Sequence, residues 1–373
     1  MSTQLSRNRQ WIGGAVVITA LLLAPLLLSD FRLGLLGRFL AYAILALGLD
    51  LIWGYTGILS LGHGVYFGLG AYCAAMYLKL EATGGKLPEF MGYSGIEQLP
   101  FFWQPFRFAW LAFPLAMIVP AALAAMLGYF AFRSRIKGVF FSILSQALAL
   151  VMVTLFLSQI GLIGGTNGIT NFKTIFGHDI NDSATQRAFY FLTVATLALT
   201  YVLCRWLVHG RFGKLLLAIR DAENRVRFTG YDPVGFKVFV YAISAALAGL
   251  AGVLFVLQVG LITPTEMDVP HSIRMVLWVA LGGRATLIGP ILGTLLVNFG
   301  ENALSESYPA MWSLMMGVAF LACILFMPRG LMGLVNDANR WIKNRRERSS
   351  STRIAEKSVT SHATTETIEN SVV

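Results

Sequence analysis

The sequence predicts an all-α, polytopic membrane protein: a helical bundle of about ten transmembrane helices, with Gly-rich broken helices in each half. Of the 373 residues, 56% are hydrophobic and only 13% are charged, whereas a soluble domain carries about 25% charged residues. The apolar residues come in separate blocks, several of which have the length of about 20 residues that crosses a lipid bilayer. We expect residues 1–335 to form one transmembrane domain and residues 336–373 to form a disordered cytoplasmic tail.

The placement of the basic residues predicts the orientation. Arg7 and Arg9 precede the first apolar block, and further Lys and Arg residues gather at 133–137, at 205–237 and in the tail from Arg329. Cationic segments stay on the cytoplasmic side, so we expect a multi-pass protein of the bacterial inner membrane with both termini in the cytoplasm. The net charge of +10 is therefore a topology signal, and no nucleic-acid partner is expected.

The first half contains a Gly-rich interruption. Its predicted spans cover about 11–29, 34–54, 64–80, 108–132 and 139–162, with a polar outer loop at 81–107. Residues 54–72 hold six glycines, each of which costs about 1 kcal/mol in a helix interior relative to alanine. We predict a break at 55–63, where the backbone is buried or lines an aqueous cavity. Gly62, His63 and Gly64 are assigned to a solute pathway, although His63 is interpreted as a packing or hydrogen-bonding residue.

Two other polar features of the first half admit more than one interpretation. Asp50 lies inside a span and is interpreted as a hydrogen-bond acceptor whose needs are met within the protein. Residues 164–172, GGTNGITNF, have the composition of a loop. This loop is either a tight turn or an outer vestibule in which Thr166 and Asn167 offer neutral hydrogen-bonding groups to a polar solute.

The second half repeats the pattern of a glycine break. Its predicted spans cover about 188–207, 238–258, 271–281, 288–305 and 310–328. The stretch GGRATLIGP at 282–290 interrupts an apolar run, and we assign Gly282 and Gly283 to the pathway. Breaks in corresponding positions of two halves indicate a solute site at a repeat interface. The internal repeat itself is a hypothesis, because the two stretches share little beyond a Leu-Gly pair.

The polar insert at 211–232 separates two long apolar blocks. One apolar stripe runs along a predicted helix through Leu215, Ile219, Ala222 and Val226. Gly213 is expected to open this helix and Gly230 to close it. The insert is either a solvated or interfacial helix, or a docking helix that receives force from a soluble partner.

The same insert carries pairs of opposite charge at helical spacing. Asp221 with Arg225 and Glu223 with Arg227 are both i,i+4 pairs with the acid first, and each such pair supports a helix by about 0.2–0.5 kcal/mol.

The sequence lacks the motifs of an enzyme. No phosphate-binding G-x-x-x-x-G-K-[ST] loop occurs, and neither paired carboxylates nor a Cys/His cluster indicates catalysis or a metal site. No Asp/Glu/His ladder is expected within the spans, so a proton relay is not predicted. We therefore expect no enzymatic activity, no cofactor and no metal, and any energy has to come from outside the chain.

Several motifs together resemble one family. GYTGILSLGHGVYFGLGAY, GGTNGITNF, RFGKLLLAIRDAENRVRFTGYDP and GGRATLIGPILGT occur in this order and look like the permease subunits of branched-chain amino-acid ABC importers, over about residues 35–335. The run at 221–233 is most similar to the larger permease of urea ABC importers. Ala285 departs from the glycine that such permeases usually carry at this position.

The resemblance implies partners and a coupling element. The partners are a second homologous permease, two ATPase subunits that bind ATP, and a periplasmic substrate-binding protein. The implied contact with an ATPase is the segment from Gly213 to Gly230, with Gly213, Ala218, Arg220, Asp221, Glu223 and Gly230 as its coupling residues. The implied cargo is urea or a short amide. The alternatives are branched-chain amino acids as cargo and, from another class, a stand-alone channel or ion-coupled carrier.

Overall fold

The computed structural model describes residues 19, 21–172, 174–180 and 182–309, together with scattered residues between 311 and 333. The elements of the first half are α2 (Asp30–Thr56), α3 (His63–Ala82), α4 (Glu89–Tyr93), η1 (Phe101–Arg107), α5 (Ala109–Arg133), α6 (Val139–Ser158), α7 (Ile160–Ile163) and η2 (Gly165–Asn167). They are followed by β1 (Thr174–Ile175), β2 (His178–Asp179), α8 (Ser183–His209), α9 (Arg211–Phe228), α10 (Pro233–Val259), η3 (Pro264–Met267), α11 (Val269–Gly282) and α12 (Ile288–Ser307). The predicted tail, residues 11–18 and 20 of the first predicted span, and most of the span predicted at 310–328 lie outside the described residues.

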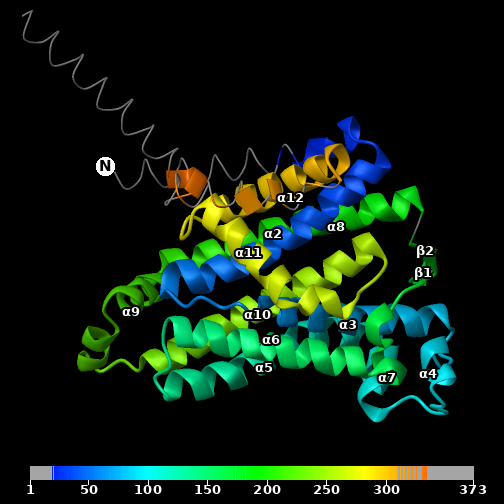
Figure 1. The fold of residues 1–373 in the computed structure, drawn as a ribbon, viewed down its shortest axis with the longest axis horizontal. Helices are drawn as coiled ribbons and strands as arrows, with labels where there is room; N and C mark the ends of the chain where they lie inside the picture. The colour runs from blue at the N-terminus through cyan, green and yellow to red at the C-terminus, as the bar shows by residue number, and fades with distance from the viewer. Residues whose placement is uncertain are drawn as a thin grey trace, which may run out of the picture.

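The fold is a helical membrane bundle, which confirms the predicted class. Long helices run side by side, with α9 at one end of the bundle and α4, α7 and the β1–β2 hairpin at the other (Figure 1). Among the described residues, five helices are long and apolar enough to cross a membrane, namely α2, α5, α6, α8 and α10. They correspond to the spans predicted at 34–54, 108–132, 139–162, 188–207 and 238–258.

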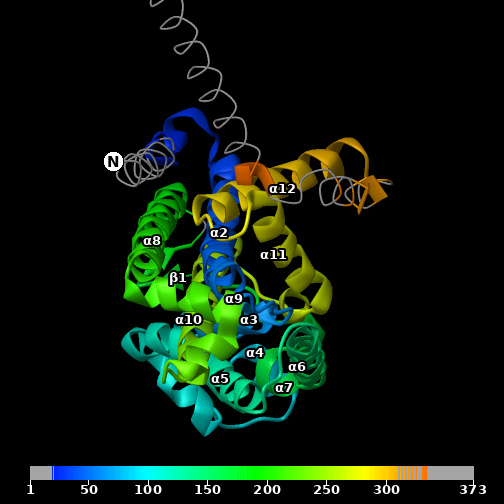
Figure 2. The same ribbon diagram turned by 90° about the vertical axis from the view of Figure 1, so that its left-hand side faces the viewer.

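The bundle has an inner and an outer set of helices. In the most apolar window of α2 and of α10, 89% and 78% of the residues are buried within the protein, against 28% in α5, 33% in α6 and 44% in α8. Figure 2 shows α2 in the middle of the molecule, with α8 on one side and α5 and α6 below. The outer helices carry exposed apolar side chains, among them Ile118, Leu150 and Trp206. This distribution fits outer helices that face lipid around a protein-filled centre.

Glycines let the inner helices approach closely. A Cβ atom added to Gly70 of α3 would overlap the carbonyl oxygen of Gly249 in α10, and one added to Gly252 would overlap that of Phe67. The α3–α10 crossing therefore brings two backbones together without side chains between them, as small residues allow in membrane helices.

Both predicted breaks are present. The helix α2 ends at Gly57, whose φ of +75° is the left-handed conformation of a helix cap, and α3 begins at His63. Two serines of α6 hold this first break, because Ser142 Oγ donates to Leu59 O at 2.8 Å and Leu61 N donates to Ser145 Oγ at 2.9 Å. The second break is the short segment 283–287 between α11 and α12.

The two loops that are predicted to lie outside the membrane contain more structure than expected. The predicted loop at 81–107 folds into α4 and η1, each of which directly follows a proline, Pro88 or Pro100. The fixed φ of proline favours the start of a helix, which the polar composition of this region conceals. The loop at 164–172 is bridged to the α10–α11 connection by the antiparallel pair Ile169 and Ile262.

Candidate functional site

The helix α9 is the predicted amphipathic element, with two corrections. Its buried residues are Gly213, Leu216, Ile219 and Val226. Leu216 therefore takes the place predicted for Leu215. The second correction is at Ala222, where φ of −153° and ψ of 60° interrupt the helix. The interruption turns the two halves of α9 relative to each other, and no single helical stripe describes both.

The ends of α9 differ partly from the prediction. Gly230 has a φ of +87°, directly after the C-cap Thr229, so a glycine closes the segment as expected. Gly213 does not open it, because the N-cap is Gly210. Gly213 lies in the first turn, where a side chain would overlap the carbonyl oxygen of Val208. Ala218 is exposed on the outer face of the helix.

Glu223 ties α9 to two other parts of the bundle. Its carboxylate lies 2.7 Å from Lys137 Nζ in the α5–α6 turn, 2.9 Å from Lys237 Nζ of α10 and 3.0 Å from Arg227 Nη2. Partial burial opposes the charge of this carboxylate, but the hydrogen bonds and charges of Lys137 and Lys237 outweigh it and lower the pKa of Glu223 to about 2. Glu223 is thus ionised at neutral pH and is the electrostatic anchor of α9.

Of the two predicted i,i+4 pairs on α9, one forms. Glu223 binds Arg227 as predicted, but Asp221 binds its neighbour Arg220 at 2.8 Å rather than Arg225. The distortion at Ala222 lies between Asp221 and Arg225 and removes the helical geometry that such a pair requires. The hydrogen bond from Arg220 also lowers the pKa of the exposed Asp221 carboxyl.

Arg220 connects α9 to the end of α2. Its Nη1 donates to Gly54 O at 2.8 Å, and its side chain packs over Gly57, the cap of that helix. The Arg284 guanidinium, from the second break, stacks 4.8 Å from the centre of the Trp53 ring. A cavity of about 420 Å³ opens between these groups, lined by Trp53, Gly54, Gly57, Arg220, Ala280, Arg284 and Ala285. The helix α9 and both breaks therefore meet at one place, which we call the coupling junction after the role predicted for α9.

Asp50 fastens the second break to α2. The fully buried carboxylate accepts hydrogen bonds from Ala285 N at 2.7 Å and from Leu287 N at 3.3 Å. Both of these residues have left-handed backbones, with φ of 59° and 57°, a conformation that costs a residue other than glycine about 1–2 kcal/mol. This geometry confirms the acceptor role predicted for Asp50 and explains why glycine suits position 285.

The predicted pathway residues do not form one continuous lining in this structure. His63 is fully buried and contacts Ser244 Oγ through Nε2 at 2.7 Å, whereas Thr166 and Asn167 are exposed in the loop at 164–172. Gly64 N donates to Ser272 Oγ at 3.2 Å and so joins the starts of α3 and α11. A side chain at Gly62 or Gly282 would collide with neighbouring backbone, and Gly283 caps α11. Their assignment to a pathway stays a prediction.

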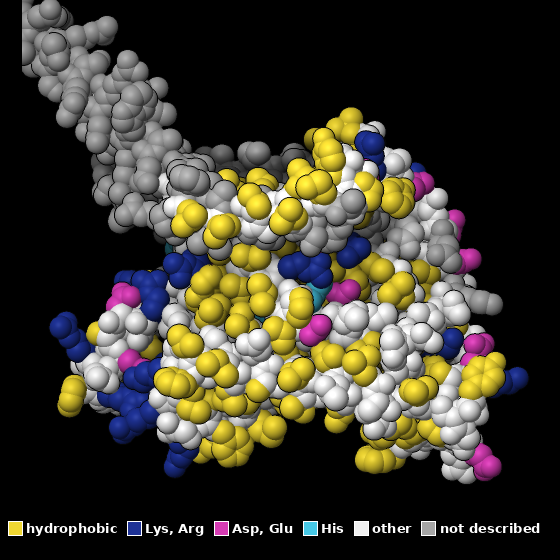
Figure 3. All heavy atoms as spheres, in the orientation of Figure 1, with side chains coloured by type: hydrophobic (Ala, Val, Ile, Leu, Met, Phe, Trp, Pro, Cys, Tyr) yellow, Lys and Arg dark blue, Asp and Glu magenta, His cyan; other side chains and the backbone are white. Residues whose placement is uncertain are grey.

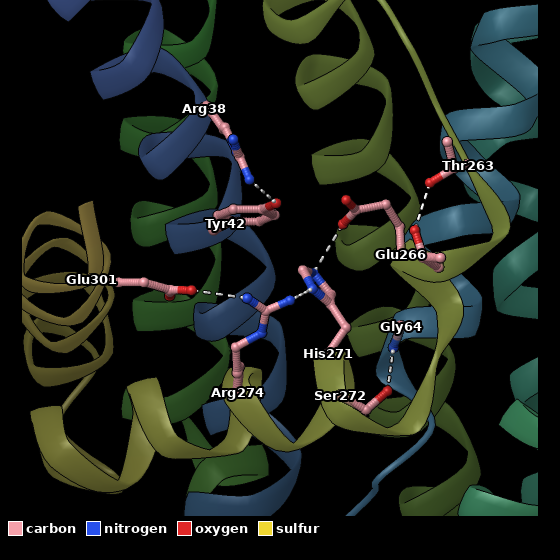
Figure 4. Close-up of polar contacts among 10 residues, drawn as sticks. Arg38, Tyr42, Gly64, Thr263, Glu266, His271, Ser272, Arg274 and Glu301 are labelled. Atoms are coloured by element: carbon pink, nitrogen blue, oxygen red, sulfur yellow. Dashed lines mark hydrogen bonds and ion pairs between the residues drawn. The ribbon is translucent and has the colours of Figure 1, made fainter. Parts of the chain in front are cut away.

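The sequence interpretation missed a chain of ionisable side chains in the interior (Figure 4). Glu266 Oε2 of η3 lies 3.1 Å from His271 Nε2, Arg274 Nη2 lies 2.9 Å from His271 Nδ1, and Arg274 Nη1 donates to Glu301 Oε1 of α12 at 3.0 Å. Arg38 of α2 points toward the same centre. Because Arg274 stands between His271 and Glu301, the cluster is not an uninterrupted Asp/Glu/His ladder, but the clustering of these charged side chains was not predicted.

The signal for that cluster was present in the sequence. His271 and Arg274 lie three residues apart in a short apolar run, which places them on one face of a helix. Charged residues in such runs face protein or water rather than lipid. The partners Glu266 and Glu301 come from separate elements, and no spacing rule links them to α11.

A multi-helix membrane bundle with interior charges, broken helices and an amphipathic surface helix defines a polytopic transport permease. The family described as "Branched-chain amino acid transport system / permease component" matches residues 31–324, and the chain belongs to this family. It is a permease component of an ATP-binding-cassette importer of that family and a multi-pass membrane protein.

Individual relatives support the same placement at low identity. The chain is 25% identical over 330 residues to the "High-affinity branched-chain amino acid transport system permease protein LivM" of Salmonella typhimurium, covering 83% of this chain and 71% of the relative. It is 22% identical over 306 residues to the "High-affinity branched-chain amino acid transport system permease protein BraD" of Pseudomonas aeruginosa, covering 78% of this chain and 91% of the relative. It is 25% identical over 204 residues to the "Ribose import permease protein RbsC" of Escherichia coli, covering 53% and 61%. No solved structure matches the chain.

Proposed function

We propose that this chain is the membrane subunit of an inner-membrane importer that is driven by separate ATPase subunits through α9 and carries urea or a short amide. The partners in this proposal are a second homologous permease, two ATPase subunits and a periplasmic binding protein, and both termini face the cytoplasm. The observation that carries the coupling role is the 2.8 Å hydrogen bond from Arg220 of α9 to Gly54 O at the end of α2. A push on α9 is thereby applied to a helix that passes through the centre of the bundle.

The charge on α9 supports its proposed contact with a soluble protein. The segment carries four Arg residues besides Lys214, and Arg211, Arg225 and Phe228 are exposed. Figure 3 shows dark blue Lys and Arg side chains gathered at the end of the molecule where α9 lies, while the sides are largely apolar. A polar, cationic surface at the end of an apolar bundle fits a site outside the hydrocarbon layer.

The cargo proposal depends on residues 221–233, which resemble the urea type of permease. A second candidate is a branched-chain amino acid, because LivM and BraD, the relatives that the chain matches over most of its length, are named for this cargo. Both cargoes would be carried by the same ATP-driven importer, so the test has to examine the transport mechanism and the identity of the cargo separately.

The test reconstitutes the chain in proteoliposomes with the second permease, the ATPase subunits and the binding protein. We expect ATP-dependent uptake of radiolabelled urea that excess leucine does not inhibit. Inhibition by leucine, with uptake of leucine itself, would assign the second cargo and leave the mechanism in place. Uptake by this chain alone, without ATP or partners, would instead identify a channel or an independent carrier.

The coupling role has its own variant and control. Arg220→Glu removes the donor to Gly54 O, and we expect at least a tenfold loss of uptake at normal abundance in the membrane, because a hydrogen bond to a charged group contributes about 1.5–3 kcal/mol. Arg225→Glu introduces the same change of charge at an exposed position of the same helix but leaves the hydrogen bond to Gly54 O in place, so we expect a smaller loss of uptake than in Arg220→Glu. Equal losses in both variants would show that only the charge of α9 matters and would contradict the specific link.

A further inference from the structure

The interior polar cluster brings together groups from four separate elements. Arg38 and Tyr42 come from α2, Glu266 from η3, His271 and Arg274 from α11, and Glu301 from α12. In Figure 4 the side chains of these six residues point toward a common centre from opposite sides. We call these six residues the polar ring.

The formal charges of the polar ring cancel. Arg38 and Arg274 are cations, while Glu266 and Glu301 are the opposing carboxylates. Because a guanidinium only donates hydrogen bonds, Arg274 Nη2 must donate to His271 Nδ1, so this nitrogen carries no proton. The His271 ring is then neutral, with its proton on Nε2. No net charge remains to favour an ionic ligand.

Several buried polar atoms of the ring have no hydrogen-bond partner among the described residues. These are Arg38 Nε, Glu266 Oε2 and His271 Nε2. His271 Nε2 and Glu266 Oε2 lie 3.1 Å apart without the alignment of a hydrogen bond. The His271 side chain is only 5% exposed, and unpaired polar groups at such depth are costly. The ring thus offers two N–H donors and one carboxylate acceptor that a ligand can satisfy.

The ring is open on one side. The side chains of Arg274 and Glu301 are 42% and 20% exposed, whereas Tyr42 and His271 are buried. In Figure 3, acidic, basic and His-coloured side chains lie side by side in a furrow in the middle of an otherwise apolar face. Charged groups on a membrane-embedded helix face protein or water rather than lipid, so this face requires a polar neighbour.

We propose that the polar ring is a transit site for a small, uncharged solute that carries an amide group. The carbonyl oxygen of the solute accepts from Arg38 Nε and His271 Nε2, and its N–H groups donate to Glu266 Oε2. Arg274 and Glu301 form the entrance and separate as the solute passes. A charged solute would disturb the balanced charges of the polar ring, whereas an amide uses polar atoms that have no hydrogen-bond partner among the described residues. This inference deepens the proposed function and depends on it.

A proton relay does not explain the same residues. An arginine stays protonated at every accessible pH, and Arg274 stands between His271 and Glu301. Protons therefore cannot pass along the chain from one carboxylate to the other.

The test uses the reconstituted importer and measures urea uptake and ATP hydrolysis on the same vesicles. Glu266→Gln keeps the size of the side chain but removes its charge. We expect about a tenfold fall in urea moved per ATP, the factor for one hydrogen bond to a charged group, while hydrolysis stimulated by the loaded binding protein stays within about twofold. The ratio of acetamide to urea uptake is also expected to change, because the two solutes present different donors. The control is Asp30→Asn, which removes the exposed ion pair with Arg187 and is expected to change neither value.

A structural role is separated from a solute contact by a charge swap. The double variant Arg274→Glu with Glu301→Arg keeps an ion pair between α11 and α12 but reverses it, and removes the donor to His271. We expect this double variant to reach normal abundance in the membrane and to show an altered ratio of acetamide to urea uptake. Urea uptake and an uptake ratio equal to those of the wild type would overturn the proposal. If Glu266→Gln does not reach the membrane, the same measurement is made on Glu301→Gln, because the Glu301 side chain is partly exposed and its replacement disturbs the fold less.

Uptake by the wild-type protein distinguishes a failure of the ring proposal from a failure of the proposed function. Wild-type protein that imports leucine and no amide would overturn the ring assignment while leaving the importer mechanism intact. Wild-type protein without ATP-dependent uptake of any solute would refute the proposed function itself.

Discussion

Glu223→Gln tests whether one carboxylate anchors α9 to the bundle. The carboxylate contacts Lys137, Lys237 and Arg227 within 3.0 Å. The fall of its pKa from 4.5 to about 2 corresponds to about 3 kcal/mol of preference for the ionised form in the folded protein. Since the Lys137 side chain is 48% exposed, solvent screening reduces this contribution to about 2 kcal/mol.

The assay is hydrogen exchange of the backbone amides of α9 in lipid nanodiscs. A loss of about 2 kcal/mol in local stability corresponds to exchange that is about 30 times faster. The increase is expected in peptides covering 211–228 and not in those covering the centre of α10. Exchange within about threefold of the wild type would refute the anchoring role.

A neighbouring acid provides the matched control. Asp221 lies two residues away on the same helix, but its side chain is 66% exposed and pairs only with the adjacent Arg220. We therefore expect Asp221→Asn to leave the exchange of α9 unchanged. A similar acceleration of exchange in both variants would mean that the loss of any negative charge on α9 destabilises the helix, and that the ion pairs of the partly buried Glu223 have no special role.

The remaining predictions concern pH, the second break and helix packing. The Glu223 carboxyl has a lowered pKa in the folded protein, so it stabilises the fold fully above its unfolded pKa of about 4.5 and loses this contribution as the pH falls toward 2. Protection of the α9 amides from hydrogen exchange should therefore fall over that pH range in the wild type and not in Glu223→Gln. Asp50→Asn replaces one of the two acceptor oxygens by an amide NH2 group, so one of the two backbone donors loses its acceptor. The break is expected to lose about 1–3 kcal/mol of stability, and we expect faster alkylation of Ala285→Cys in that background. Ala285→Gly removes the left-handed strain and should raise thermal stability by up to about 1 kcal/mol. Gly293→Ala would overlap the Trp278 carbonyl and should reduce abundance in the membrane, whereas Gly300→Ala meets open space and should be tolerated.

The sequence predicts the bundle well because hydrophobic length is a direct physical signal. The helices α2, α5, α6, α8 and α10 start and end within a few residues of the predicted spans, since a span has to satisfy its backbone within itself. The two breaks were also predictable, because the glycines around Gly57 and Gly283 disfavour a continuous helix. The distortion at Ala222 was not, since alanine is the best helix former and only the tertiary contacts of Glu223 and Arg220 explain the position of the chain there.

The candidate site was predicted where its residues are adjacent in the chain and missed where they are not. Arg220, Asp221 and Glu223 stand within four residues, so their clustering is visible in the sequence. The hydrogen bonds from Ala285 and Leu287 to Asp50 join positions more than 230 residues apart. No periodicity carries such information, because a buried carboxylate can be satisfied by any donor that the fold brings to it.

The helix α2 belongs to both proposed sites, and its geometry relates them. Tyr42 of the polar ring and Gly54 of the coupling junction are 12 residues apart on this uninterrupted helix, which corresponds to about 18 Å along its axis. Asp50 lies one turn before Gly54, so the turn that receives the hydrogen bond from Arg220 also holds the backbone of the second break. The break in turn connects α11 to α12, the helices that carry Arg274 and Glu301. In the proposed mechanism, a displacement of α9 therefore reaches the ring along two connections, through α2 itself and through the break, and the second connection moves the proposed entrance relative to Arg38 on α2.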